Sequence, residues 1–298
     1  MPEVDVVIGV YNGEKYLSDM LKSIRDQKGV KVNLIVSDDG SHDNSIVIAE
    51  EFSSDFNSFV QVYGSAQGPA QNFLSALKYS KSKYLAFADQ DDIWCDDHLV
   101  NSVNRLQKFD LIPALTFCAV GEFKGTSKKA KIWPRKSPTL ELHALITENP
   151  ARGCTIVMNK LAVSRIKDSN PTNVIMHDWW SVLLIKLVGE VIYSELPEVW
   201  YRVHADSVTA NSRRLKQRVS RLFLALKGNW PIVTQLNSLV NDSNNYNVDP
   251  ISKKQLDLFS QNNRKSIIFY PRRFRMGLID EVAIRILLLI RWLIHEDK

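Results

Sequence analysis

The sequence predicts an α/β fold in which helices cover both faces of a mostly parallel sheet. Short apolar runs rich in Val and Ile alternate with segments of helical period, which is the pattern of βαβ units. The first run, 4–10, is almost continuously apolar, as expected of a strand buried on both faces. In such sheets ligands bind beyond the carboxyl ends of the strands, so the residues that follow each strand are the first candidates for a functional site.

The predicted elements run through the first 210 residues. Strands are expected at 4–10, 32–36, 60–63, 84–88, 153–158 and 199–203, and helices at 16–24, 43–52, 69–80 and 177–187. Residues 124–136 are rich in Lys and Ser and have no clear period, which predicts a surface loop. We expect one domain over residues 1–210, with halves at about 1–95 and 96–210.

Beyond this domain, the sequence predicts a basic amphipathic helical extension over 211–298. Apolar residues recur on one helical face while Arg and Lys occupy the other. The apolar residues are Leu215, Val219, Leu222, Phe223 and Leu226, and the basic ones are Arg213, Arg214, Lys216, Arg218 and Arg221. The last segment, 279–294, is strongly apolar, but charged residues interrupt it, so we expect no transmembrane span there.

Composition narrows the class of protein. The chain has 298 residues, of which 45% are hydrophobic and 24% charged, and these values are typical of globular proteins rather than disordered or multi-span ones. Its three cysteines, Cys95, Cys118 and Cys154, are widely spaced, and we find no leader of signal type before the first strand. Both features predict a reducing cytoplasm. The net charge of +5 is concentrated in the last third, but no nucleic-acid reading motif accompanies it, so we expect no nucleic-acid partner.

The strongest chemical signal is Asp89-Gln90-Asp91-Asp92, which directly follows an apolar strand. Carboxylates crowded at a strand end repel one another, and a hard divalent cation with oxygen ligands offsets that repulsion. Such a cation can bridge phosphoryl oxygens and act as a Lewis acid on a departing diphosphate. The alternative is that these acids cap a helix that begins near Asp96.

A second acidic turn, Asp38-Asp39-Gly40-Ser41, ends the second predicted strand. Its carboxylates can accept hydrogen bonds from a nucleotide base or from ribose hydroxyls. The same residues also suit a simple turn before a helix capped by Asp43. Its position at the same sheet edge as the first acidic turn favours the ligand-binding interpretation.

His177-Asp178-Trp179-Trp180 opens the last predicted helix of the domain. A sugar can stack on a Trp ring while Asp178 accepts the proton of its hydroxyl group, and the apolar rings would raise the pKa of that base. The alternative is a capped helix with two core tryptophans.

Two further motifs are candidates for binding. In Tyr201-Arg202-Val203-His204, Arg202 and His204 share one face of an extended segment, where they could bind phosphate and metal, or could be surface residues without a function. Gly153-Cys154-Thr155 offers a backbone open to close approach and a hydroxyl group, or else a strand entry with a buried thiol.

Together these motifs resemble the family 2 glycosyltransferases, specifically the bacterial polysaccharide subgroup described as rhamnosyltransferase-like. The resemblance covers about residues 4–208 and rests on the order and spacing of six motifs. These are Val10-Tyr11-Asn12-Gly13, Ser37-Asp38-Asp39-Gly40-Ser41, Asp89-Gln90-Asp91-Asp92-Ile93-Trp94, Gly153-Cys154-Thr155, His177-Asp178-Trp179-Trp180 and Tyr201-Arg202-Val203-His204. Many relatives have Pro-Thr before the Tyr-Asn pair, whereas this chain has Gly9-Val10 and so lacks a nucleotide-facing hydroxyl.

The resemblance implies a GT-A fold and an inverting, metal-dependent transfer of a sugar from a nucleotide diphosphate, with Asp178 as the base. It also implies Mg²⁺ or Mn²⁺ at Asp89, Asp91 and His204. The residues implied for the nucleotide-sugar are Val10, Tyr11, Asn12, Asp38, Asp39, Asn72, Asp89, Gln90, Asp92 and Arg202. Those implied for the acceptor are Gly153, Cys154, Thr155, His177, Trp179 and Trp180. In this scheme residues 1–95 form the nucleotide-sugar half and 96–210 the acceptor half.

The expected partners are a UDP- or dTDP-sugar and a growing cell-surface polysaccharide or lipid-linked glycan, met at the inner face of the cell membrane through the C-terminal helices. Two other functions are compatible with the fold. A sugar nucleotidyltransferase would need a glycine-rich, basic phosphate loop after the first strand, where this chain has Tyr11-Asn12-Gly13-Glu14. A non-catalytic membrane scaffold would not need Asp89, Asp91 and Asp178. Nicotinamide chemistry is disfavoured because no G-x-G-x-x-G opens the first helix.

Overall fold

The computed structural model describes residues 1–125, 127–169, 174–204, 231–243, 246–260, 270–275 and 277–294. The chain forms two compact units. The first comprises Met1–Ser137, Ala151–Asn170 and Met176–Val203, and the second comprises Pro138–Pro150, Pro171–Ile175 and His204–Lys298. The domain boundary predicted after residue 210 lies outside the described residues and stays a prediction.

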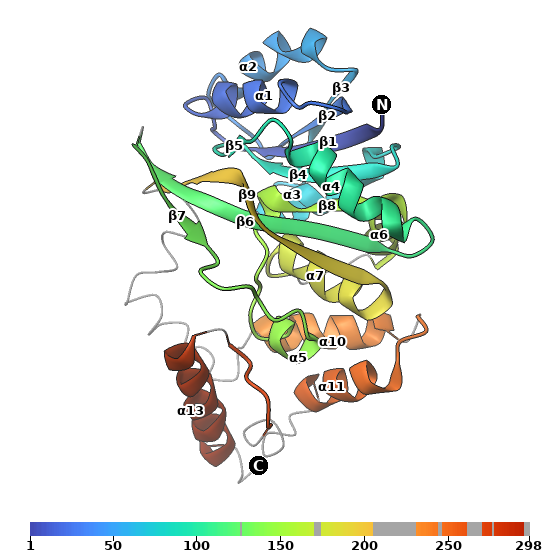
Figure 1. Ribbon diagram of the computed structural model, residues 1–298, viewed down its shortest axis with the longest axis vertical. Coiled ribbons are helices and arrows are strands. Elements are labelled where there is room, and N and C mark those ends of the chain that lie inside the picture. Colours follow the sequence, from blue (N-terminus) through green and yellow to red (C-terminus); the bar gives the residue numbers. More distant parts are fainter. Residues whose placement is uncertain are drawn as a thin grey trace. The chain divides into compact units, whose positions relative to one another are not determined.

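The first unit is built on a nine-stranded sheet (Figure 1). Its strands are β1 (Glu3–Val10), β2 (Lys31–Asp38), β3 (Ser58–Tyr63), β4 (Tyr84–Asp89), β5 (Ile93–Trp94), β6 (Ala114–Lys124), β7 (Ser127–Trp133), β8 (Val157–Asn159) and β9 (Glu190–Arg202). The order is β3-β2-β1-β4-β8-β6-β9-β5, and β7 pairs with β6. Strands β1 to β4 are parallel, whereas β8 is antiparallel to both of its neighbours. The predicted α/β class with a largely parallel sheet is confirmed.

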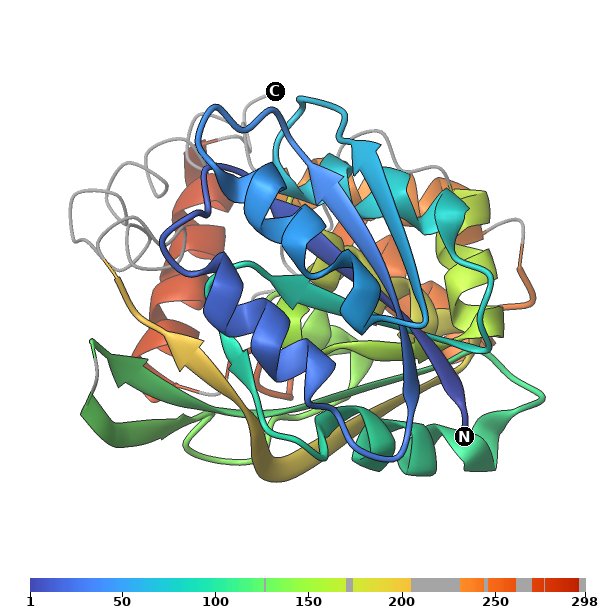
Figure 2. The ribbon, with the colours of Figure 1, turned by 90° about the horizontal axis from the view of Figure 1, so that it is seen from above.

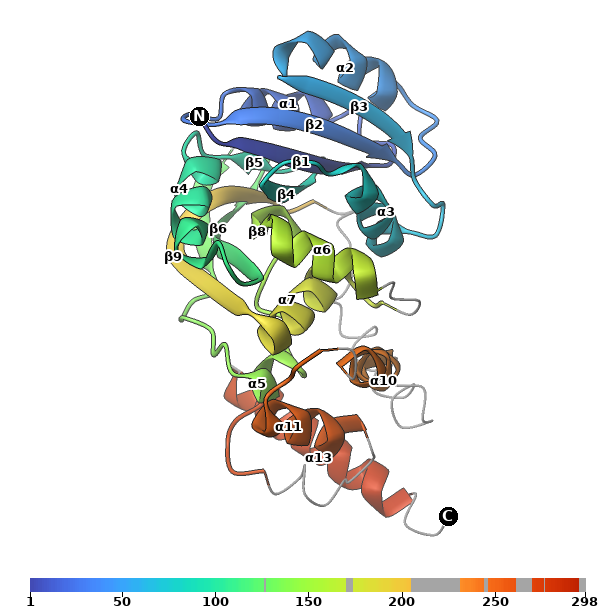
Figure 3. The ribbon, with the colours of Figure 1, turned by 90° about the vertical axis from the view of Figure 1, so that its right-hand side faces the viewer.

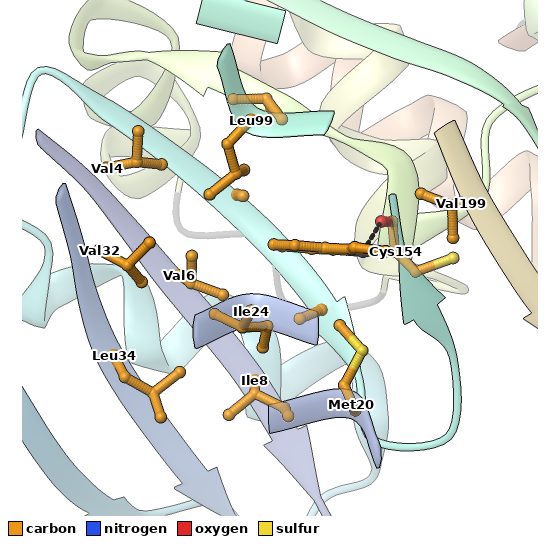
Figure 4. Packing of buried hydrophobic residues seen from close by; sticks show 14 of the residues in the cluster. Val4, Val6, Ile8, Met20, Ile24, Val32, Leu34, Leu99, Cys154 and Val199 are labelled. Atoms are coloured by element: carbon orange, nitrogen blue, oxygen red, sulfur yellow. Dashed lines mark hydrogen bonds between the residues drawn. The ribbon is translucent and has the colours of Figure 1, made fainter. Parts of the chain in front are cut away.

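Helices cover both faces of this sheet. Helices α1 (Leu17–Arg25) and α2 (Ser45–Glu51) lie over β1 and β2 (Figure 2), and α4 (His98–Leu106) packs on the same side. Helices α3 (Pro69–Ala76), α6 (Lys160–Ser169) and α7 (His177–Val188) adjoin one another on the opposite face (Figure 3). The core between α1, α4 and the sheet contains alternate residues of β1, and Figure 4 shows Val4, Val6 and Ile8 there with Met20 and Ile24.

The structure corrects two sequence-based predictions and adds a strand that the sequence analysis did not predict. Residues 124–136 do not form a loop, because Ser127–Trp133 is strand β7, which pairs with β6. The exposed Lys131 fits an edge strand, where positive charge discourages pairing with other chains. The strand predicted at 153–158 is instead a 3₁₀ turn, Gly153–Thr155, followed by the short strand β8. Strand β6 was not predicted at all, although its residues from Ala114 to Val120 are all buried.

A buried carboxylate fixes the start of the strand that carries the acidic turn. Asp5 on β1 accepts hydrogen bonds from the backbone N–H groups of Lys81 (2.6 Å) and Ser82 (2.8 Å), just before β4 begins. It also accepts hydrogen bonds from the side chains of Ser80, Ser82 and Asn33. Burial opposes ionisation of Asp5, but the hydrogen bonds from Ser82, Asn33 and Lys81 outweigh burial and lower its pKa. These bonds support the register in which Gly9 of β1 lies beside Asp89 of β4.

The second unit contains helices α5 (Leu142–Leu145), α10 (Pro231–Ser243), α11 (Pro250–Ser260) and α13 (Leu278–Ile294). Helices α10 and α11 pack together. Glu281 of α13 accepts hydrogen bonds from the backbone N–H groups of Phe274 (2.7 Å) and Arg275 (2.9 Å). No helix among the described residues is both long and apolar enough to cross a membrane. The basic helix predicted from 211 to 226 lies outside those residues.

We predict that Asp5→Ala lowers the free energy of unfolding by about 2 to 4 kcal/mol, because it removes a charged acceptor and leaves buried donors unpaired. Urea unfolding followed by circular dichroism measures this change. Glu3→Ala, at an exposed position of the same strand, is the matched control. An equal effect of the two substitutions would show that the Asp5 hydrogen bonds do not stabilise the sheet.

Candidate active site

The parallel register brings both acidic turns to one edge of the sheet. Val10 at the end of β1 pairs with Asp38 at the end of β2, and Gly9 pairs with Asp89 at the end of β4. The residues that follow these three strands therefore meet beyond their carboxyl ends, where parallel α/β sheets bind their ligands.

The loop after β1 is held by the two acidic turns. Gln90 fixes Tyr11 from both sides: its Oε1 accepts from the Tyr11 N–H (2.9 Å) and its Nε2 donates to the Tyr11 carbonyl (3.0 Å). Asn12 adopts a left-handed conformation with φ of 47°. Its N–H donates to Ser41 Oγ (3.0 Å), and its Oδ1 accepts from the His42 N–H (2.9 Å). The Tyr11 side chain is left exposed at the edge of the site.

The second acidic turn is built mainly by its own hydrogen bonds. Asp38 Oδ1 accepts from the N–H (3.0 Å) and the hydroxyl (2.6 Å) of Ser41. Asp39 Oδ1 accepts from the Ala66 N–H at 2.8 Å. Both groups of the buried Asn72 amide bond to Ser37, with Nδ2 donating to the Ser37 carbonyl at 2.9 Å. In this arrangement Asn72 stabilises the end of β2, and its predicted contact with a nucleotide stays a prediction.

The first acidic turn concentrates negative charge in a region of low solvent access. Burial, together with the charges of Asp91 and Asp178, raises the pKa of Asp89 to about 7. Burial and the charges of Asp91 and Asp89 raise the pKa of Asp92 well above its usual range. Asp92 Oδ1 accepts from the Arg202 N–H at 2.9 Å. Its Oδ2 is buried and makes no hydrogen bond of standard geometry in the described part of the chain, although a hydrogen bond with the Cys154 thiol acts to lower the pKa of the Asp92 carboxyl.

These carboxylates fit a hard divalent cation. A ligand atom from each of Asp89, Asp92 and Cys154 lies within 4.8 Å of the others, and Asp91 is close enough to affect both carboxylates electrostatically. Burial and the charges of Asp92 and Asp89 raise the pKa of the Cys154 thiol well above its usual range. A protonated thiol is a poor ligand for Mg²⁺ or Mn²⁺, so the carboxylates are the better donors. His204 belongs to the second unit, and its predicted role as a metal ligand stays a prediction.

The N-terminus of α7 brings Asp178 to the same site. Asp178 is buried in the first turn of the helix, its Oδ1 accepts from the Trp179 N–H at 2.6 Å, and its charge contributes to the raised pKa of Asp89. The structure therefore brings the predicted base close to the predicted metal-binding acids. Trp180 is a core residue whose Nε1 donates to Ser169 Oγ (3.0 Å), so its ring is not available to stack on an acceptor in this conformation.

His177 is packed among aromatic rings rather than open to solvent. Its ring stacks on Phe73 at a centroid distance of 4.0 Å and meets Phe87 edge-on at 4.9 Å. Burial lowers the pKa of His177 to about 3, so the ring is neutral at physiological pH. A Cβ at Gly153 would lie 2.7 Å from His177 Nε2, so the glycine allows the 3₁₀ turn to approach the start of α7.

The rest of the Gly153-Cys154-Thr155 turn is also buried. The Cys154 carbonyl accepts from Trp94 Nε1 at 3.0 Å, and the Thr155 hydroxyl donates to the Arg152 carbonyl at 2.8 Å. The turn thus shapes the wall beside the carboxylates, and direct acceptor contact through Cys154 or Thr155 stays a prediction.

Arg202 ties the acidic turn to β9. Its backbone N–H donates to Asp92, and its Nε donates to the Asp91 carbonyl at 2.8 Å. Its guanidinium lies over the rings of Tyr16 (4.6 Å) and Phe123 (4.8 Å). Arg202 therefore positions the acidic turn, in addition to any contact with phosphate.

Sequence reasoning missed a second arginine at this site. Arg152 forms an ion pair with Glu122 (2.6 Å), and its guanidinium carbon lies 4.5 Å from the ring centroid of Trp133 and 3.9 Å from that of Tyr201. Its positive charge acts against the rise in the pKa of Asp89. Its position directly before Gly153 was the available signal, but the partners of Arg152 come from β6, β7 and β9, and neither β6 nor β7 was predicted.

The neutral His177 gives a pH-dependent prediction. Its folded pKa of about 3 lies below the ordinary value of 6.5, so the unfolded chain takes up the proton first as the pH falls. The stability that neutral His177 contributes is fully present above pH 6.5 and is lost toward pH 3, by up to about 1.4 kcal/mol per pH unit. We expect the difference in unfolding free energy between the wild type and His177→Gln to shrink as the pH falls from 7 to about 4.5.

Urea titrations at several pH values measure this difference, and His42→Gln at an exposed position controls for the substitution itself. A difference that stays constant with pH would contradict the burial of a neutral His177.

Comparisons with known proteins agree with this geometry. The family model described as glycosyl transferase family 2 matches residues 5–164. A dTDP-rhamnosyl transferase of Shigella flexneri, RfbG, is 27% identical over 252 residues, which are 79% of this chain and 86% of RfbG. A diphosphoundecaprenol β-1,3-glucosyltransferase of Escherichia coli, WfgD, is 32% identical over 106 residues, which are 35% of this chain and 41% of WfgD.

Solved structures show the same fold at low sequence identity. Staphylococcus aureus TarS 1–349 in complex with UDP-GlcNAc superimposes with a TM-score of 0.60 at 15% identity, covering 96% of this chain and 81% of TarS. The mannosyltransferase PcManGT of Pyrobaculum calidifontis, in complex with GDP-Man and Mn²⁺, gives a TM-score of 0.57 at 15% identity over 99% of this chain and 76% of PcManGT. The expected GT-A fold is confirmed, and the comparisons favour glycosyl transfer over nucleotidyl transfer or a scaffold role. The chain belongs to glycosyl transferase family 2 and is a glycosyltransferase.

Proposed function

We propose that this protein catalyses an inverting, metal-dependent transfer of a sugar from a nucleotide diphosphate to a hydroxyl group of a growing glycan. The observation that carries this proposal is the meeting of Asp89, Asp91, Asp92 and Asp178 at the carboxyl end of the sheet, where their charges interact. A family 2 glycosyltransferase needs a place for a diphosphate and a base for the acceptor, and these residues offer both in one site.

The donor is a dTDP- or UDP-sugar in this proposal. RfbG is named for a dTDP-rhamnosyl donor, and TarS was solved with UDP-GlcNAc. The nucleoside would lie against the loop of Val10, Tyr11 and Asn12, which both acidic turns hold in place. Asp38 and Asp39 offer carboxylate oxygens to the base and the ribose.

A divalent cation, Mg²⁺ or Mn²⁺, would be held by Asp89 and Asp91, with His204 as a further proposed ligand. The Asp92 oxygen that makes no hydrogen bond of standard geometry among the described residues and the raised pKa of Asp89 are both features that a bound cation would relieve. When bound, such a cation neutralises charge on the departing diphosphate. Gln90 and Arg202 keep the acidic turn in position: Gln90 Oε1 accepts from the Tyr11 N–H, and Arg202 Nε donates to the Asp91 carbonyl.

Asp178 accepts the proton of the attacking hydroxyl group in this proposal. Its place in the first turn of α7 favours its charged form, since the N-terminus of a helix stabilises negative charge. Inversion follows if the hydroxyl attacks the sugar from the side opposite the diphosphate, with one bond formed as the other breaks. Neutral His177 next to it does not compete for the proton, because burial disfavours its charged form.

The acceptor is a cell-surface polysaccharide or a lipid-linked glycan precursor. RfbG transfers rhamnose by its name, and WfgD is named for a diphosphoundecaprenol substrate. A lipid-linked acceptor would place the protein at the cytoplasmic face of a membrane, in peripheral contact through its C-terminal helices.

We predict that Asp178→Asn lowers the transfer rate by about 10²- to 10⁴-fold, because it removes the general base. Donor affinity should change little, since Asp178 acts on the acceptor. The true donor is first identified by thermal unfolding with a panel of nucleotide-sugars and Mg²⁺ or Mn²⁺, because bound donor stabilises the fold.

Asp168→Asn, at an exposed position of α6, is the matched control and should retain full activity. Normal transfer by Asp178→Asn would remove this residue from the mechanism.

A further inference from the structure

One face of α13 is apolar and open to solvent. Leu278, Val282, Ile286, Leu289 and Ile290 are each between 37% and 61% exposed. They are spaced three or four residues apart, apart from the adjacent pair at the end, so they form one stripe along the helix. The helix has 17 residues and is therefore about 25 Å long.

The opposite face of α13 is fixed within the second unit. Ile284 and Glu281 are buried, and Glu281 binds the backbone N–H groups of Phe274 and Arg275. Arg285 Nε forms an ion pair with Glu281 (2.6 Å), and its Nη2 donates to the carbonyls of Tyr270 (3.0 Å) and Arg272 (2.9 Å). These bonds set the rotation of the helix, so the apolar stripe faces away from its own unit.

A contiguous apolar stripe of this size marks an interaction surface. The helix cannot cross a bilayer, because no described helix is long and apolar enough to do so. An apolar face on such a helix suits the boundary between lipid headgroups and acyl chains, where the helix lies in the plane of the membrane.

Positive charge in the same unit favours an anionic surface. Arg272 and Arg273, in the segment whose backbone Arg285 binds, are exposed, and Arg272 also forms an exposed ion pair with Glu141 (3.8 Å). The chain as a whole carries a net charge of +5. A second copy of this chain would bring the same positive charge to the interface, whereas anionic lipid attracts it.

We propose that the α13 stripe of Leu278, Val282, Ile286, Leu289 and Ile290 inserts into the headgroup region of an anionic membrane. This inference rests on the proposed function, since a membrane surface is where a lipid-linked acceptor is found. It adds the helix face that makes the contact and the class of lipid that it prefers.

The test is flotation of the full-length chain with vesicles of phosphatidylcholine alone or mixed with phosphatidylglycerol. We expect binding to the anionic vesicles, and at least about a tenfold loss of the partition coefficient in the double variant Ile286→Glu, Leu289→Glu. Leu111→Glu is the control, because Leu111 is an apolar residue of the first unit that is 93% exposed. The melting temperature of each variant is compared with that of the wild type. Since the substituted residues are exposed, we expect it to stay the same.

Three outcomes would overturn the inference. These are an absence of wild-type binding to anionic vesicles, an unchanged partition coefficient in the double variant, and a wild-type dimer in light scattering that the double variant dissociates. The last result would assign the stripe to a second copy of the chain.

Nucleotide release from the donor with a water-soluble acceptor separates this inference from the proposed function. Transfer without vesicle binding would reject the membrane stripe alone. Vesicle binding without transfer from any nucleotide-sugar would reject the proposed function alone.

Discussion

The burial of neighbouring carboxylates at the end of β4, together with their mutual repulsion, is the constraint on which the rest of the site depends. Burial and the neighbouring charges raise the pKa of Asp89 to about 7 and hold the pKa of Asp92 well above its usual range. Arg152 offsets part of this repulsion, and the backbone N–H of Arg202 satisfies one Asp92 oxygen. The compensation is incomplete, because the other Asp92 oxygen makes no hydrogen bond of standard geometry among the described residues. The proposed divalent cation would relieve this remaining repulsion.

Hydrogen bonds and packing elsewhere in the fold offset the free-energy cost of holding these carboxylates together. Asp5 anchors the start of β4 at one end of the sheet, and Gln90 joins the acidic turn to the loop after β1 at the other. Beside the carboxylates, Gly153 lets the 3₁₀ turn approach His177, which directly precedes Asp178 on α7. Each contact joins elements distant in sequence, so the position of the carboxylates is set by packing rather than by the acidic turn alone.

The sequence predicted those parts of the fold and site whose signals are local. The apolar runs of β1, β2 and β4 and the acidic residues after β2 and β4 are contiguous, so their meeting at one sheet edge follows from parallel topology. The helix that begins at His177 was predicted for the same reason.

The missed features depend on partners far away in the chain. Strand β7 is polar and lysine-rich, and it is a strand because β6 pairs with it. Arg152 gains its place from Glu122, Trp133 and Tyr201. Gly64 has no local signal, yet a Cβ at this position would clash with the side chain of Asn72. Trp180 was proposed as an acceptor platform because it lies two residues after Asp178 in sequence, but the turn of the helix directs its side chain into the core.

Calorimetric titration of Mn²⁺ into the protein, with UDP and dTDP in turn, tests the central claim most directly. Nucleotide diphosphate should tighten Mn²⁺ binding, because in the proposed site phosphate oxygens would add to the carboxylate ligands. Asp91→Asn should weaken Mn²⁺ binding at least tenfold while raising the melting temperature of the metal-free protein, since one repulsive charge is removed. Mn²⁺ binding that is equally tight in Asp91→Asn, with a lower melting temperature, would contradict a cation site built from these repelling carboxylates.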